Sequence, residues 1–382
     1  MKYLPNYKDG SIVNLMGSIG SNFGYKSPYG ALKLLPSSEI KKYKNVVLIV
    51  IDGLGYEYLK NKDSFLKENL RGSISSVFLS TTACALTSLL TGAAPQQHGF
   101  TGWLINLKEV GIVTRILPFN TRYNHLDLVG DFKMKNILKE KSFTFKIKNK
   151  SFVINPLSVM NSEFTNLTSK GSKKLGYETM KGFFRQIKNS VNSKGKKYVF
   201  AYWPIFDGLS HEYGVGSKES RKQFEELDKS IKRLVKSIKG TNTMVIVTAD
   251  HGFIDTPLNR FLRLENHLKL KECLTLPLCG EGRTVHCYVR PSKVKQFESY
   301  VKNNLGKYCE MYKGQDLIDK GYFGLGKPNS KLFDRVGDYI LIMKENYVLK
   351  DQLEGEELTI HIGHHGGMSK QEMLVPLVVI DC

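Results

Sequence analysis

The chain has 382 residues, which at roughly 100–200 residues per domain is enough for two domains or for one large α/β domain with insertions. A composition of 41% hydrophobic and 24% charged residues excludes a disordered, collagen-like or coiled-coil protein. The longest plain apolar run, residues 46–51, is far shorter than the ~18 residues of a membrane span, and no secretion signal begins the sequence. We therefore expect a cytoplasmic protein with no membrane partner.

The charge balance is strongly basic, with 56 Lys and Arg residues against 36 Asp and Glu residues and a net charge of +20. A field of this sign attracts polyanions and phosphorylated small molecules alike. The excess is mostly Lys in short, scattered runs, so solvated faces are favoured over a nucleic-acid surface, which stays possible. The six cysteines contain no CxxC pair, and we expect free thiols.

Four apolar runs are predicted to be buried strands, and their continuous rather than alternating pattern is typical of a sheet covered on both faces. They are residues 46–51, 198–203, 244–248 and 374–380. Between the second and third, apolar residues recur at intervals of three and four over residues 218–240, which predicts an amphipathic helix ended by Gly240. The sequence thus predicts an α/β fold with a mostly parallel central sheet flanked by helices.

The weaker periodicity of the intervening stretches divides the chain into a core and inserted cap segments. We expect the core to comprise residues 38–100, 195–256 and 356–382, and the cap to comprise residues 101–194 and 257–355. A helix that carries Leu175, Met180, Phe183, Phe184, Ile187 and Val191 is expected to return the chain from the first insertion to the core.

Polar clusters follow three of the four strands, where ligands bind in open α/β sheets. Taken singly, each cluster has an ordinary explanation. Asp52 could be part of a turn. Asp207 and His211, one helical turn apart, could be a surface pair, and the His364-His365 pair could lie in a polar loop. Asp250 and His251 offer an oxygen and a nitrogen from consecutive residues. Together these oxygen and nitrogen ligands, without a thiolate, suit zinc or manganese and suffice for two divalent ions.

A candidate nucleophile lies in the string STTACALTSLLTGAAPQQHG, residues 80–99. Small residues and hydroxyls precede a predicted helix over residues 83–90, which places Thr81 or Thr82 at its N-terminus. Backbone amides and the helix dipole favour an alkoxide and a bound phosphate at that position. The alternative is an ordinary N-cap.

These segments resemble the alkaline phosphatase superfamily and, within it, the type I phosphodiesterases or nucleotide pyrophosphatases. The resemblance rests on VVLIVIDGLG, TTACALTSLLTGAAPQQHG, FDGLSHEYG, TADHG and HHGGMSKQEMLVPL, in the family's order. It implies two metal sites and selects Thr82 as the nucleophile, His365 over His364 as a ligand, and a structural role for His98. The implied ligands of one metal are Asp207, His211 and His365, and those of the other are Asp52, Asp250, His251 and Thr82.

The sequence also departs from the family's pattern. Ala83-Cys84-Ala85 stands where the family commonly has Phe-Pro-Asn, and Trp103 lies near the place of an Asn that helps to hold a phosphoryl oxygen. Asn106 lies further on. Trp103 is suited either to stacking on a base or aryl group or to packing beneath the cap.

The resemblance implies a metal-dependent hydrolase that cleaves phosphodiester or nucleotide pyrophosphate bonds of a small molecule through a threonyl-phosphoryl intermediate. No Arg or Lys lies near Thr82 between residues 79 and 102, which favours a diester over a monoester dianion. Arg283, or a Lys from an insertion, could still reach the site. A phosphomonoesterase on the same site and a basic, non-catalytic nucleic-acid-binding protein are the alternatives, and the oligomeric state is left open.

Overall fold

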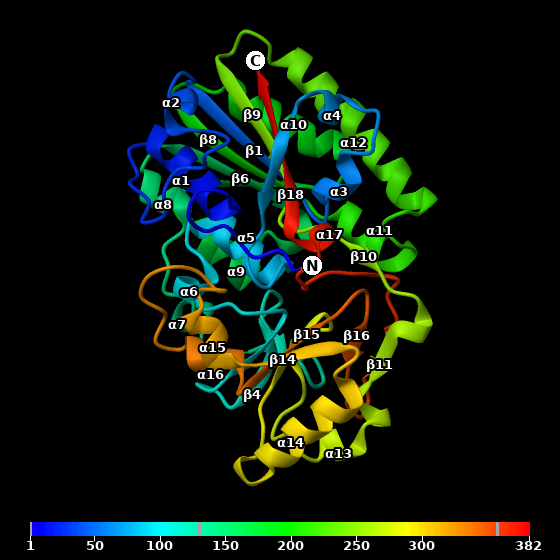
Figure 1. Ribbon diagram of the computed structural model, residues 1–382. Helices are drawn as coiled ribbons and strands as arrows, with labels where there is room; N and C mark the ends of the chain where they lie inside the picture. The colour runs from blue at the N-terminus through cyan, green and yellow to red at the C-terminus, as the bar shows by residue number, and fades with distance from the viewer. Residues whose placement is uncertain (1, 129–131, 357–358) are drawn as a thin grey trace.

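A seven-stranded sheet forms the centre of the larger lobe of the computed structural model, which describes residues 2–128, 132–356 and 359–382 (Figure 1). The strand order is β2-β18-β9-β1-β8-β6-β7. Their bounds are Leu70–Ser75, Leu374–Asp381, Thr243–Thr248, Asn45–Ile51, Lys197–Trp203, Lys150–Pro156 and Lys173–Tyr177, in that order. The five strands from β9 to β7 are mutually parallel, whereas β18 is antiparallel to both β9 and β2. The predicted α/β class with a mostly parallel sheet is confirmed, and all four predicted strands belong to this sheet.

Helices cover both faces of the central sheet, as the alternation of side chains along β8 shows. Tyr198 packs against Phe23 and Phe143, whereas Trp203, which points to the opposite face, packs against Phe183 of α10. The principal helices are α1 (Ile12–Asn22), α5 (Thr82–Thr91), α10 (Met180–Asn192), α11 (Ile205–Tyr213) and α12 (Lys218–Ser237). Helix α12 buries the predicted apolar stripe and ends three residues before Gly240.

Short helices connect these elements. They are α2 (Ser37–Ile40), α3 (Tyr56–Leu59), α4 (Phe65–Glu68), α6 (Pro95–His98), α7 (Met134–Ile137), α8 (Phe143–Ile147), α9 (Glu163–Thr168), α13 (Leu268–Lys271), α14 (Val294–Tyr300), α15 (Gly314–Asp319), α16 (Leu332–Val336) and α17 (Lys370–Met373). Among the described residues, no helix has both the length and the apolar character required to cross a membrane. All six cysteines are free thiols, as expected.

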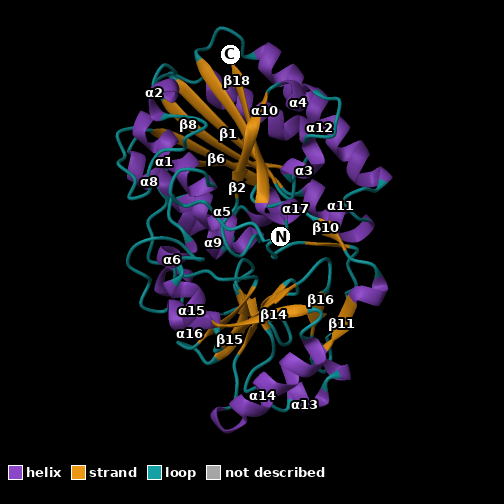
Figure 2. Ribbon diagram, in the orientation of Figure 1, coloured by secondary structure: helices purple, strands orange, loops and turns teal. Residues whose placement is uncertain are grey.

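A second, mostly antiparallel sheet forms the smaller lobe (Figure 2), which we call the cap. Its strands are β14 (Cys309–Lys313), β15 (Tyr339–Met343), β13 (Thr284–Cys287), β12 (Cys279–Glu281), β3 (Leu104–Leu107), β4 (Ile112–Arg115) and β5 (Asn120–Thr121), in that order. Beside them lie two small pairs, β11 (Phe261–Arg263) with β16 (Val348–Lys350) and β10 (Ile254–Asp255) with β17 (Gly363–His364). The cap has an apolar core of its own, which includes Leu264, Val285, Phe297 and Leu341.

Residues 150–194 belong to the core lobe, whereas the prediction assigned them to the inserted cap. Strands β6 and β7 and helix α10 extend the central sheet and cover it, although the sequence interpretation placed them in the first insertion. Leu175 lies in β7 rather than in the expected helix, which begins at Met180. Strand β7 carries two lysines and is only partly buried, so it lacks the continuous apolar run that identified the four predicted strands.

Candidate active site

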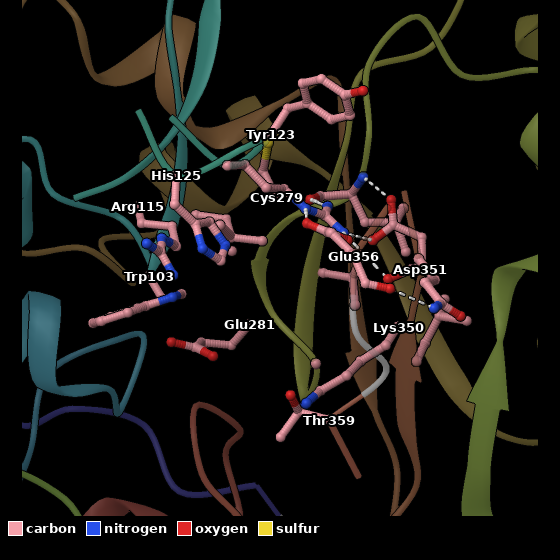
Figure 3. A pocket seen from close by; sticks show the side chains of 18 of the residues that line it. Trp103, Arg115, Tyr123, His125, Cys279, Glu281, Lys350, Asp351, Glu356 and Thr359 are labelled. Carbon is pink, nitrogen blue, oxygen red and sulfur yellow. Dashed lines mark hydrogen bonds and ion pairs between the residues drawn. The ribbon is translucent and has the colours of Figure 1, made fainter. Parts of the chain in front are cut away.

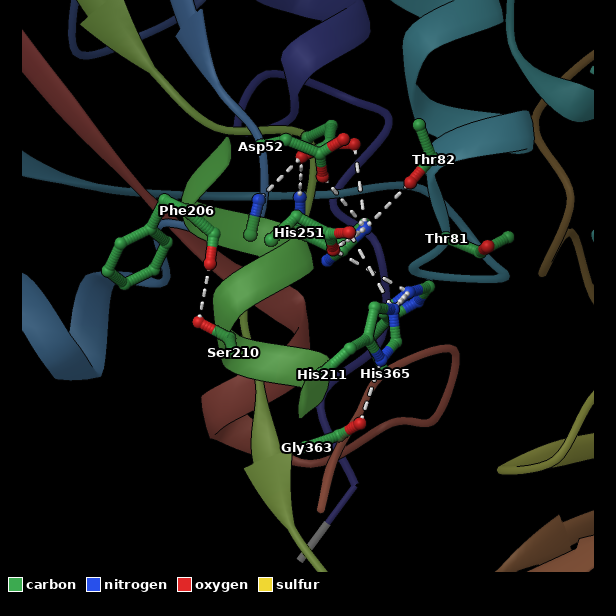
Figure 4. Close-up of polar contacts among 12 residues, drawn as sticks. Asp52, Thr81, Thr82, Phe206, Ser210, His211, His251, Gly363 and His365 are labelled. Carbon is green, nitrogen blue, oxygen red and sulfur yellow. Dashed lines mark hydrogen bonds and ion pairs between the residues drawn. The ribbon is translucent and has the colours of Figure 1, made fainter. Parts of the chain in front are cut away.

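Polar side chains from several distant segments meet at one edge of the central sheet. Strands β1, β8 and β9 are parallel, so Asp52, helix α11 and Asp250 all follow strand ends on this edge. Strand β18 runs the other way, and the segment that precedes it therefore brings His365 to the same edge. Figure 4 shows the resulting convergence.

The first predicted set of ligands, Asp207, His211 and His365, is assembled in space. The Nε2 atoms of His211 and His365 lie 3.1 Å apart. Oxygens of Asp207 lie 3.7 Å from His211 Nε2 and 3.9 Å from His365 Nε2. The i, i+4 spacing of Asp207 and His211 on α11 turns both side chains to the same side of the helix, as the sequence suggested.

The second predicted set, Asp52, Asp250 and His251, lies beside the first. His251 Nε2 is 3.4 Å from Asp52 Oδ1 and 3.5 Å from Asp250 Oδ2. The two sets adjoin where Asp207 Oδ1 lies 4.0 Å from His251 Nε2. One oxygen or nitrogen from each of Asp52, Asp250 and His251 falls within 4.8 Å of the others, and the same holds for Asp207, His251 and His365.

The donor atoms fit divalent cations. Asp52 Oδ1, Asp207 Oδ1 and Asp250 Oδ2 are buried and have no hydrogen-bond partner in the described part of the chain, a costly state for a carboxylate unless a cation neutralises it. His211 Nδ1 donates to the Gly363 carbonyl at 2.8 Å, which leaves Nε2 unprotonated and directed at His365 Nε2. The Nε2 lone pair of His211 and the Nε2 atom of His365 are thus close enough to bind the same ion.

The protonation states agree with this assignment. Burial, together with the neighbouring carboxylates of Asp207 and Asp250, raises the pKa of Asp52 well above its ordinary value in the metal-free protein. Burial lowers the pKa of His211 to about 3 and that of His365 well below its ordinary value. The imidazoles are therefore neutral near pH 7, the form that binds metal.

Thr82 is the hydroxyl that faces the cluster. It is the first residue of α5, and its Oγ1 lies 3.1 Å from His251 Nε2. Thr81 occupies the N-cap position of α5, but its hydroxyl donates to Glu281 Oε1 at 2.6 Å and makes no capping bond to the helix among the described residues. Figure 4 shows the Thr82 side chain, rather than that of Thr81, directed at His251. Of the two predicted candidates, the geometry thus favours Thr82.

Residues of the cap and of β8 complete the surroundings, and of these only Trp103 was singled out by number from the sequence. Trp103, Glu281 and Lys350 of the cap line a cleft of about 360 Å³ together with Thr82, His211 and His365 of the core. Burial raises the pKa of Glu281 to about 7 and lowers that of Lys350. The Tyr202 hydroxyl, from β8, donates to Asp52. Glu281, Lys350 and Tyr202 belong to none of the motifs, and only the expectation that an insertion could supply a lysine pointed towards Lys350.

Of the other residues considered from the sequence, Arg283 and Asn106 lie outside the cleft and His98 is buried in the core. Arg283 does not reach the cleft, because its guanidinium forms a buried, bidentate pair with Glu372, with both bonds at 3.0 Å. Asn106 lies in β3 and does not line the cleft among the described residues, whereas Trp103 does. His98 is buried and bonded to Ser88 and to the Phe100 amide, in keeping with a structural role.

The fold and this cluster, which could hold divalent metal ions, are those of a hydrolase of the alkaline phosphatase superfamily. The family model for type I phosphodiesterase / nucleotide pyrophosphatase matches residues 46–368. The chain therefore belongs to the type I phosphodiesterase / nucleotide pyrophosphatase family.

Solved structures show the same fold. Murine ectonucleotide pyrophosphatase / phosphodiesterase 5 is 17% identical, with a TM-score of 0.66 and 87% of each chain covered. Human ectonucleotide pyrophosphatase / phosphodiesterase 5 is 14% identical over the same shares, also with a TM-score of 0.66. Phosphonoacetate hydrolase from Sinorhizobium meliloti 1021 is 15% identical, with a TM-score of 0.65, over 88% of this chain and 90% of its own. No curated protein sequence matches the chain significantly.

Proposed function

We propose that the protein hydrolyses phosphodiester or nucleotide pyrophosphate bonds of a small molecule on a two-metal site, with Thr82 as the nucleophile. The observation that carries the proposal is the position of Thr82 Oγ1, 3.1 Å from His251 Nε2, at the border of six converging ligand side chains. A structure of murine ectonucleotide pyrophosphatase / phosphodiesterase 5 described as inactive has a threonine-to-alanine substitution and AMP bound, which supports a threonine in this role.

In this proposal Asp207, His211 and His365 hold one ion, and Asp52, Asp250, His251 and Thr82 hold the other. The ligand set, with three carboxylates, three imidazoles and no thiolate, suits zinc, and manganese is the alternative. When bound, such ions acidify a coordinated hydroxyl and neutralise charge on the phosphoryl oxygens.

The chain's own residues then perform two displacements. Thr82 Oγ1 attacks phosphorus in line, the bond to the leaving oxygen breaks, and a threonyl-phosphoryl intermediate forms. Among the described residues, the amides of Thr82 and Ala83 in the first turn of α5 have no backbone partner, and they favour the phosphoryl oxygens. Water then attacks the same phosphorus, the Oγ1–P bond breaks, and Thr82 is restored.

The charges around Thr82 favour a monoanionic diester over a monoester dianion. The three carboxylates and a deprotonated Thr82 together balance the charge of two divalent cations. Lys350 adds a positive charge to the cleft, but Glu281 lies in the same cleft and offsets it when ionised. A dianion would thus find little net positive charge, which makes the phosphomonoesterase the second candidate.

Steady-state hydrolysis of bis-p-nitrophenyl phosphate and p-nitrophenyl phosphate on metal-defined protein tests the proposal. We expect the diester to be preferred and Thr82→Ala to lower its turnover by roughly 10³-fold or more. Zinc content, measured by elemental analysis, should remain close to that of the unaltered protein. Thr81→Val is the matched control and should keep most of the activity. Near-normal turnover by Thr82→Ala would exclude the nucleophile, and a strong monoester preference would exclude the diesterase.

A further inference from the structure

A second cleft, of about 630 Å³, adjoins the candidate active site and extends into the cap (Figure 3). The two clefts share four lining residues, namely Trp103, Glu281, Gly282 and Lys350. A ligand at Thr82 can therefore continue past these residues into the second cleft, which we call the cap cleft.

Arg115 presents a cation to the cap cleft. It ends β4 and pairs with Leu104 of β3, and the next residue, Ile116, bonds to the Trp103 carbonyl at 3.0 Å. Figure 3 shows the Arg115 side chain beside the Trp103 ring. Its Nε donates to Asn120 Oδ1 at 2.9 Å, and no carboxylate of the described residues lies within ion-pair distance of it.

Lys350 presents a second cation where the two clefts meet. The amide of Leu349 donates to the Gly282 carbonyl at 2.9 Å, which anchors the end of β16 beside Glu281 and Gly282. The Lys350 side chain packs over Gly282, where a Cβ would come within 3.3 Å of its Cε. Within the described ranges, Lys350 forms no ion pair, and its ammonium lies 5.8 Å from the Phe261 ring centre.

Arg122, which lines the same cleft, differs from these two cations. Arg122 is 2.8 Å from Asp351 and 3.0 Å from Glu356, so its charge is neutralised by the protein. Arg115 and Lys350 form no such ion pair among the described residues, although Glu281 lines both clefts with Lys350. Because a half-buried cation without an ion-pair partner costs free energy, these two side chains are suited to an anionic ligand.

The direction of displacement indicates which part of the substrate occupies the cap cleft. Thr82 attacks from the core, and an in-line displacement expels the group on the opposite side of phosphorus. Trp103, Glu281 and Lys350 approach the cleft from the cap. The leaving group therefore departs towards the cap.

Resting on the proposed function, we infer that the cap cleft is a leaving-group subsite in which Arg115 and Lys350 bind a negatively charged group of the leaving moiety. The guanidinium of Arg115 can make paired hydrogen bonds to an oxyanion, and Lys350 supplies a point charge nearer to Thr82. The preferred substrates are then those whose leaving group carries a phosphate or a carboxylate.

Three substrates that all transfer thymidine 5′-phosphate to Thr82 distinguish an effect on leaving-group binding from an effect on the chemical step. They are the p-nitrophenyl ester, the 4-carboxyphenyl ester and thymidine 5′-diphosphate, each assayed by release of thymidine 5′-phosphate. We expect Lys350→Met and Arg115→Met to lower kcat/KM for the two substrates with anionic leaving groups by roughly 10-fold each. The p-nitrophenyl ester should change by less than about twofold. Lys313→Met, an exposed cap lysine that lines neither cleft, is the charge-matched control.

Isothermal titration of metal-free protein with inorganic pyrophosphate gives a second readout, since no metal then attracts the anion. We expect both variants, but not Lys313→Met, to bind pyrophosphate roughly 10-fold more weakly. A loss confined to thymidine 5′-diphosphate identifies a phosphate site, and a loss shared with the carboxyphenyl ester identifies a general anion site. Equal changes for all three substrates, or unchanged pyrophosphate binding, would overturn the subsite. Thr82-dependent hydrolysis of the p-nitrophenyl ester would in that case leave the proposed function standing.

Discussion

Three carboxylates in the cluster lie without a neutralising side chain. Asp52, Asp207 and Asp250 form no ion pair with any Lys or Arg of the described residues, and their near neighbours are imidazoles that are neutral at pH 7. Such an arrangement costs stability in the metal-free protein, because buried like charges repel. It is typical of a site where function, rather than stability, determines the residues.

The buried His98 is expected to make the stability of the folded protein depend on pH. Burial lowers its pKa to about 3, whereas the unfolded chain has the ordinary value near 6.5. The unfolded state therefore takes up the proton first, so this contribution to stability is complete above pH 6.5 and is lost as pH falls from there towards 3. Below pH 6.5, we expect the free energy of unfolding to fall less steeply with decreasing pH in His98→Asn than in the unaltered protein. The two slopes should differ by up to about 1.4 kcal/mol per pH unit. Denaturant titrations of both proteins from pH 4 to pH 8 measure it, and parallel slopes would contradict the assignment.

Most of the candidate site could be predicted from the sequence, because its residues directly follow apolar strands whose ends are recognisable. Asp52 and Asp250 are examples. Glu281 and Lys350 could not be predicted, since they come from β12 and β16 of the cap, and only three-dimensional pairing brings these strands to Thr82. Arg283 was a candidate for the cleft, but its charge is taken by Glu372, a partner 89 residues away.

At the scale of elements, the Arg283–Glu372 pair ties the cap to the core. Arg283 lies between β12 and β13, and Glu372 belongs to α17 next to β18. Glu372 also accepts the Gly367 amide at 2.8 Å, close to the segment that carries His365. The pair therefore connects the cap sheet to the loop that supplies a proposed ligand.

We expect Arg283→Met to destabilise the protein by about 3–5 kcal/mol, because it leaves the Glu372 charge buried and unpaired. Replacing both residues with Met should cost less than the sum of the single changes, since neither charge then remains. Chemical denaturation of the four proteins in a double-mutant cycle measures the coupling. Strictly additive losses would show that the two side chains do not depend on each other.

The elements themselves were predictable to different degrees for a physical reason. Strands β1, β8 and β9 are buried on both faces, and their uninterrupted apolar runs identify them. Strand β7 is at the edge of the sheet and only partly buried, so its sequence KKLGY carries no comparable signal. The cap sheet is joined by pairs of strands that are distant in sequence, such as β12 with β3 and β13 with β15, and local patterns do not specify such pairing.

At the scale of the whole molecule, one face of the cap sheet packs around an apolar core of its own. The six proposed ligands lie at the carboxyl ends of the central strands, whereas Val285, Leu341 and Met343 of β13 and β15 belong to the second core. The opposite face of β15, with Ile340 and Ile342, joins the main core. A ligand that binds only the folded protein stabilises it by about 2.7 kcal/mol at a concentration of 100 Kd. Metal binding should therefore stabilise the core lobe locally and leave the cap core nearly unaffected.

We expect metal removal by a chelator to increase hydrogen exchange at the carboxyl ends of β1 and β9 and in α11, but not in β13–β15. Hydrogen-exchange mass spectrometry of metal-loaded and metal-free protein checks this. The same treatment of Asp207→Asn, which lacks a proposed ligand, should produce a smaller difference. A uniform increase over both lobes would show that the ions stabilise the molecule as one unit instead.

The stereochemical course at phosphorus tests the central claim most directly. A thymidine 5′-phosphorothioate p-nitrophenyl ester of defined configuration, hydrolysed in ¹⁸O-labelled water, gives a product whose configuration can be assigned. Attack by Thr82 followed by attack of water comprises two inversions, so the account predicts net retention. Net inversion would mean that water displaces the leaving group directly, and Thr82 would then not be the nucleophile.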